Sequence, residues 1–182
     1  MPIRTDAWNL LCQWTQSDSL RKHALAVEAA MRGAARRQGG DEELWGITGL
    51  LHDFDYERYP TLPDHPTKGA EVLRETGYPP EMIDAVLGHA SMVPRTTLMA
   101  KWLYAVDELC GFLLAVAYVR PSRKIAEVEV SSVKKKLKDK AFARAVNRED
   151  IRQGAAELGV ESESLIAQVL EDLKGSAEAL GV

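Results

Sequence analysis

The chain has only four histidines, and the residues around them indicate which way they point. His23 and His89 each fall on the apolar side of an expected helix, because apolar residues recur three, four or seven positions away. His52 is followed directly by Asp53 at the end of an apolar helix, where neighbours about 100° apart can flank one point beside the core. His65 opens the next expected helix. His52 and Asp53 can therefore bind the same ion.

A second carboxylate, Asp107, lies on the apolar side of the most apolar segment, four residues after Leu103 and three before Cys110. A buried, unpaired carboxylate is costly, and the only inward cations that the sequence offers are the histidines or a bound metal. Imidazoles and carboxylates without thiolates suit Fe, Mn, Zn or Ni better than Mg. Two aspartates and four histidines exceed the three protein ligands of a usual catalytic zinc site, which points to two ions bridged by a carboxylate and a solvent molecule. Ordinary hydrogen-bonded core histidines remain the alternative at this stage.

The elements that must position these residues are helices, because apolar residues recur at helical spacing along nearly the whole chain. Strict alternation occurs only around residues 125–130 and is too brief to support a sheet. An all-α fold is therefore expected. The expected helices run over about 18–38, 41–53, 64–77, 80–91, 96–119, 132–146 and 162–173, with a further helix start at Asn147.

Length and composition favour one globular body. The 182 residues include 46% hydrophobic residues, and no flexible linker divides them. We expect a helical domain over residues 1–120 and a C-terminal helical extension over 121–182, packed on the same body with a frayed tail from 175. The net charge of -4 disfavours nucleic acid as a partner. Two cysteines, no signal core and no apolar run of about 20 residues suggest a soluble cytoplasmic protein without a membrane partner.

The stretch GLLHDFDYERYPTLPDHPTKGAEVLRETGYPPEMIDAVLGHA at residues 49–90 carries a resemblance to a known family. With KHALAVEAAMR before it and KWLYAVDEL after it, the chain resembles the HD-domain metal-dependent phosphohydrolases, particularly the small HDIG-type proteins, over about residues 18–120. The family pattern H…HD…D corresponds to His23, His52-Asp53 and Asp107.

This resemblance implies an HD-type helical bundle and two ligand sets that share one carboxylate. It further implies hydrolysis of a phosphomonoester or phosphodiester bond in a small phosphorylated metabolite or nucleotide by a metal-activated hydroxide, with Asp53 as catalytic residue. The implied ligands are His23, His52, Asp53 and Asp107 for one divalent ion and Asp53, His65 and His89 for the other.

The sequence departs from the family after the HD pair, where Phe54-Asp55 replaces Ile-Gly. Asp55 is therefore a candidate for supporting a metal ligand or for contacting substrate. Substrate phosphate also needs cations near the mouth of the site, and the candidates are Lys68, Arg120 and Arg123.

Two further functions stay open on the same residues. Binuclear HD scaffolds also include di-iron oxygenases of the myo-inositol oxygenase kind, and the ligand set does not separate them from hydrolases. The third hypothesis is a non-catalytic module that is stabilised by metal and senses a ligand. The sequence does not decide the substrate, the native metal or the oligomeric state.

Overall fold

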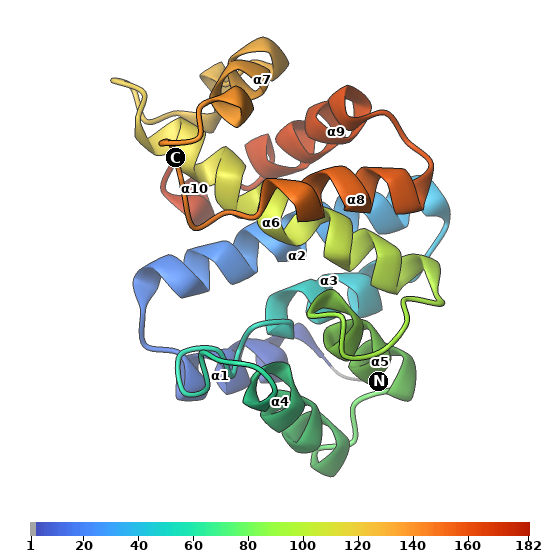
Figure 1. Cartoon of the computed structure of the whole chain (residues 1–182). Coiled ribbons are helices and arrows are strands. Elements are labelled where there is room, and N and C mark those ends of the chain that lie inside the picture. Colours follow the sequence, from blue (N-terminus) through green and yellow to red (C-terminus); the bar gives the residue numbers. More distant parts are fainter. Residues whose placement is uncertain (1–2) are drawn as a thin grey trace.

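Helices account for all the regular secondary structure in residues 3–182, which are the residues that the structure, a computed structural model, describes (Figure 1). The expectation of an all-α fold is confirmed. The elements are α1 (Arg4–Trp14), α2 (Asp18–Gln38), α3 (Glu42–Leu51), α4 (Asp64–Glu75), α5 (Pro80–His89), α6 (Leu98–Tyr118), the 3-10 helix η1 (Ile125–Glu127), α7 (Val130–Lys138), α8 (Arg148–Leu158), α9 (Ser162–Lys174) and α10 (Ala177–Leu180).

The two longest helices, α2 and α6, cross the middle of the molecule, and the other helices lie around them (Figure 1). Side-chain caps help to begin each of them, because Ser17 accepts from the backbone N–H of Leu20 and Thr97 accepts from that of Ala100. Helix α3 packs closely on α2. A Cβ placed on Gly49 would lie 2.8 Å from the carbonyl oxygen of Val27, so this approach of two backbones requires glycine.

Two hydrophobic clusters form the core. One joins α2 and α6 to the C-terminal helices and includes the buried Trp102. The other joins α1, α3, α4 and α5 and includes the buried Phe54. The chemistry-bearing residues come from helices of both clusters, so their meeting depends on how the two halves of the core pack together.

The C-terminal segment packs on the same body. Helix α9 is tied to α2 by Arg37, which donates to both carboxylate oxygens of Asp172 at 2.8 and 2.7 Å. The expectation of a frayed tail is wrong, because Leu180 of α10 is fully buried and α10 packs against α2. No helix in residues 3–182 is both long enough and apolar enough to cross a membrane.

Two further expectations about elements need correction. Helix α1 was not expected, although Ala7 and Leu11 are buried one turn apart on its inner face. The helix expected over 132–146 ends at Lys138. The guanidinium of Arg148 donates to the backbone carbonyls of Asp139 and Phe142 in the following non-helical segment, and so satisfies groups that a longer helix would have paired.

Candidate metal centre

The six histidines and aspartates singled out in the sequence meet at one place, although five different helices or helix ends supply them. His23 is on α2, and His52 and Asp53 directly follow α3. The other three are His65 at the start of α4, His89 at the end of α5 and Asp107 in the middle of α6.

The first group contains four donors, His23, His52, Asp53 and Asp107. Nε2 of His23 lies 3.0 Å from Oδ1 of Asp107, and Nε2 of His52 lies 3.3 Å from the same oxygen. The two Nε2 atoms are themselves 3.3 Å apart. Oδ2 of Asp53 completes the group at 3.5 Å from Nε2 of His52. These four residues could hold one metal ion, because their donor atoms surround a single point.

The second group contains three donors, Asp53, His65 and His89. Oδ1 of Asp53 lies 3.2 Å from Nε2 of His65 and 3.1 Å from Nε2 of His89. The two oxygens of Asp53 therefore face different groups, Oδ2 the first and Oδ1 the second. This is the arrangement of a carboxylate that bridges two ions.

The local structure at the ends of α3 and α5 explains how their histidines are aimed. The last carbonyls of a helix have no partner within it. Nδ1 of His52 donates to the carbonyl oxygen of Gly49 at 2.7 Å, and Nδ1 of His89 donates to that of Val86. Each ring thus satisfies a free carbonyl three residues earlier and directs Nε2 away from the helix, toward the carboxylates.

The same geometry tests whether a metal fits. With the proton on Nδ1, Nε2 of a neutral histidine presents a lone pair, and in both groups that lone pair faces a carboxylate oxygen. Two acceptors face one another there unless a cation lies between them. Imidazole nitrogen and carboxylate oxygen are donors for divalent transition ions, so the residues present fit such ions.

Protons take over this role in the metal-free protein. Burial opposes the charged form of His52, but the carboxylates of Asp53 and Asp107 raise its pKa well above the usual value. Burial likewise opposes charge on His65, while hydrogen bonds with Asp53 and Asp55 raise its pKa to about 9. Although burial favours neutral carboxyls, the neighbouring histidines lower the pKa values of Asp53 and Asp107. Positive charge, on protons or on a metal ion, therefore stabilises the two carboxylates of the site.

A pocket of about 290 Å³ opens beside both groups. Helices α6 and α8 contribute acidic and aromatic side chains to its lining. Tyr104 donates to a carboxylate oxygen of Asp150 at 2.9 Å. Burial together with the charge of Asp107 raises the pKa of Glu108 to about 7. No Lys or Arg is among the described residues that line it. The lining residues are His23, Asp53, Tyr56, His65, His89, Ala90, Tyr104, Asp107, Glu108, Gly111 and Asp150.

The candidates for substrate binding do not line this pocket. Asp55 is fully buried, and its two oxygens accept from Nδ1 of His65 and from the backbone N–H of Gly69, so neither oxygen is free to face the pocket. Lys68 is paired with Glu71 at 3.1 Å on the outer side of α4.

The two arginine candidates lie beyond the end of α6. Asp107 is about 16 Å along the helix axis from the last residue of α6. Arg120 lines a different hollow, with Lys135 and Lys136, and Arg123 is an exposed turn residue with a positive φ of 52°. Neither arginine is among the described residues that line the pocket beside the two donor groups.

Two of the lining residues that the sequence analysis does not name, Tyr104 and Glu108, could have been found from the sequence. Tyr104 lies three residues before Asp107 and four before Glu108, so its position on α6 is next to both of them. Asp150 belongs to α8, whose packing on α6 has no local signal in the sequence. Tyr56 lies in the turn after α3 and packs edge-on against the ring of His65.

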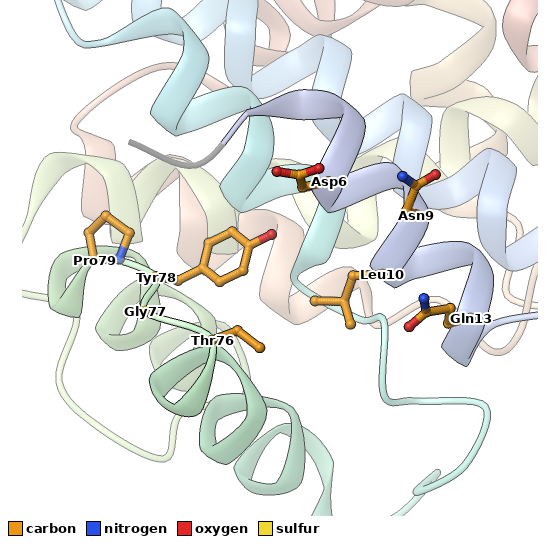
Figure 2. Close-up of a pocket in the computed structure, with 8 residues that line it drawn as sticks. All are labelled: Asp6, Asn9, Leu10, Gln13, Thr76, Gly77, Tyr78 and Pro79. Carbon is orange, nitrogen blue, oxygen red and sulfur yellow. The ribbon is translucent and has the colours of Figure 1, made fainter.

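A larger hollow of about 700 Å³ lies elsewhere, between α1 and the turn that joins α4 to α5 (Figure 2). Asp6 and Gln13 line one side of it, and Tyr78 lines the other. It shares no residue with either donor group. Although it is larger, this hollow contains none of the donor residues and is not the candidate metal centre.

Residues 20–172 match the family described as HD domain. The chain belongs to the HD-domain family. All six donors of this HD domain lie within the matched residues, and so do Asp55 and Asp150. Comparison with curated proteins and with solved structures gives no significant match. Family membership and the two His/Asp groups together indicate a metal-dependent hydrolase.

Proposed function

We propose that this HD domain hydrolyses a phosphoester bond of a small phosphorylated metabolite or nucleotide with the help of two divalent ions. The observation that carries the proposal is the division of Asp53, whose Oδ2 faces the four-donor group and whose Oδ1 faces the three-donor group beside an open pocket. A site of this form is suited to in-line displacement at phosphorus.

The residues of the chain hold and separate charge in this proposal. His23, His52 and Asp107 would hold one ion, His65 and His89 the other, and Asp53 both. The bound ions would supply a water that ionises near neutral pH and positive charge for the phosphoryl oxygens. An ion at the three-donor group would have fewer protein ligands than one at the four-donor group, and all three of its donor residues line the pocket.

The lining of the pocket supports a small substrate whose phosphate charge is balanced at the metal centre. The described lining residues include no Lys or Arg that could neutralise the phosphate. The ligand types favour Fe, Mn, Zn or Ni over Mg. Substrate binding should therefore depend on metal as strongly as turnover does.

Hydrolysis of 4-nitrophenyl phosphate and bis(4-nitrophenyl) phosphate, followed by a panel of nucleotides, tests the proposal. The wild-type protein loaded with Mn, Zn or Fe should release phosphate or 4-nitrophenol, and a chelator or the Asp53→Ala variant should abolish this release. Metal-loaded protein that hydrolyses none of these esters would contradict the proposal. Consumption of oxygen by an iron-loaded form would instead support the di-iron oxygenase.

A further inference from the structure

Asp55 is a fully buried carboxylate that lies behind the metal centre. Its Oδ1 is 2.7 Å from Nδ1 of His65, and its Oδ2 accepts from the backbone N–H of Gly69 at 2.7 Å. Both oxygens are thus used. The other histidines with a described Nδ1 contact, His52 and His89, donate to backbone carbonyls, so only His65 is backed by a charged group.

The position of His65 in the chain makes this contact necessary. The residues His65 and Pro66 have non-helical backbone angles ahead of the regular part of α4, so the helix itself does not fix the ring. The backbone N–H of Gly69 lies in the first turn, where such groups have no partner within the helix. Asp55 accepts from it and holds its charge at a helix N-terminus, which favours an anion.

Gly69 allows the carboxylate of Asp55 to come this close to the start of α4. A Cβ placed on it would lie 2.9 Å from both Cγ and Oδ2 of Asp55, so a side chain here would push the carboxylate away. Glycine at position 69 and aspartate at position 55 together let one carboxylate bridge the helix start and the imidazole ring.

We propose that Asp55 is the positioning residue that keeps the proton of His65 on Nδ1 and so turns the lone pair of Nε2 toward Asp53, completing the three-donor group. A carboxylate behind a metal-bound imidazole fixes its tautomer and raises its basicity. This inference rests on the proposed function only in that the three-donor group binds an ion. It assigns to Asp55 a role at one of the two ion positions and not at the other.

The Asp55→Asn variant separates this role from a general structural one. If the amide oxygen faces His65, the amide nitrogen meets the N–H of Gly69, and two donors face each other. If the amide turns round, its nitrogen donates to Nδ1 and forces the proton of His65 onto Nε2. Both arrangements oppose ion binding at the three-donor group.

The experiment is titration of metal-free protein with Zn²⁺ against a chromophoric chelator. In Asp55→Asn the second equivalent should bind about 10–100-fold more weakly than in wild type, while the first equivalent keeps its affinity. In a His65→Ala background, Asp55→Asn should have no further effect on the remaining equivalent. An unchanged second equivalent, or equal weakening of both, would overturn the proposal.

A matched control is Asp172→Asn, which makes the same change in another buried carboxylate that accepts two hydrogen bonds, far along α9. It should leave both Zn²⁺ equivalents unchanged. If Asp55→Asn does not fold, ¹⁵N NMR of the Zn²⁺-loaded wild type gives a second test. His65 should be protonated at Nδ1, and a proton on its Nε2 would overturn the proposal.

The outcome is independent of the substrate. Two tight Zn²⁺ equivalents without hydrolysis of any phosphoester would contradict the proposed function and leave the role of Asp55 intact. Hydrolysis of a phosphoester, together with an unaltered second Zn²⁺ equivalent in Asp55→Asn, would support the proposed function and contradict the role of Asp55.

Discussion

The position of each proton decides whether an imidazole of this site can bind an ion. His52 and His89 receive their orientation from a carbonyl at the end of their own helix, and His65 receives it from Asp55. In each case Nε2 is left to face a carboxylate. Under the proposed function, an ion bound there would replace protons that the metal-free protein holds between these groups.

This exchange predicts a pH dependence of stability in the metal-free protein. The pKa of His65 rises from an ordinary 6.5 to about 9 on folding, and that of His52 also rises. A raised pKa stabilises the folded state fully below about pH 6.5, and this contribution is lost as the pH rises to 9. The melting temperature of metal-free protein should therefore fall between pH 6.5 and 9.

The metal-loaded protein is the control for this prediction, because its histidines are already unprotonated at Nε2. Its melting temperature should fall much less over the same range. Parallel curves for the two forms, measured by circular dichroism, would contradict the proposed exchange of protons for metal.

The identities of the donors could be predicted at the residue scale, because each histidine lies where a helical pattern or a helix end directs it inward. Asp107 illustrates the limit of the same argument. The pattern predicts burial, whereas its side chain keeps 19% of its exposure because it faces the pocket. Hydrophobic periodicity indicates the inward side of a helix but does not distinguish a filled core from a cavity.

At the scale of elements, the close contact of α2 with α3 sets the distance between His23 and His52. Gly49→Ala would place a Cβ 2.8 Å from the carbonyl oxygen of Val27, and neither backbone can yield without moving its helix. We expect a loss of about 1–3 kcal/mol in the free energy of unfolding, measured with urea, and weaker metal binding at the four-donor group.

Gly175→Ala is the matched control for this change. Gly175 has a φ of −64°, and its Cβ would meet only one atom, at an ordinary distance of 3.5 Å. Its unfolding energy and metal binding should stay close to those of wild type. Equal stability of the two variants would show that the contact of α2 with α3 does not hold the donors in place.

The elements differ in how well the sequence predicts them. Helices with strong caps and long apolar faces, such as α2 and α6, are predicted nearly to their ends. Helix α1 begins at Arg4, its N-cap residue Ile3 provides no side-chain cap, and the helix buries few residues, so its pattern is weak. The end of α7 depends on contacts from Arg148, which lies further along the chain, and local propensity does not contain that information.

On the scale of the whole molecule, the C-terminal helices complete both the core and the pocket. Asp150 of α8 contributes to the lining, and Arg37 joins α2 to α9 through Asp172. These contacts join residues more than 40 positions apart, and no sequence motif marks them. The position of residues 121–182 relative to the donors therefore could not be predicted from the sequence and is seen only in the structure.

Removal of the Arg37 side chain tests whether this connection stabilises the body without forming part of the site. Arg37→Met leaves Asp172, whose side chain is 6% exposed, without its cation, and should reduce the free energy of unfolding by about 1–3 kcal/mol. Lys174→Met removes a cation from the exposed Glu171 and should have a much smaller effect. Urea denaturation that gives equal values for both variants would contradict this.

The central claim is that two ions share Asp53, and the most direct test is elemental analysis of metal per chain in protein purified without added metal. Wild type should contain about two equivalents, His65→Ala about one and Asp53→Ala almost none. Equal metal content in wild type and His65→Ala, or no metal in wild type even after addition of Mn, Fe or Zn, would contradict the claim.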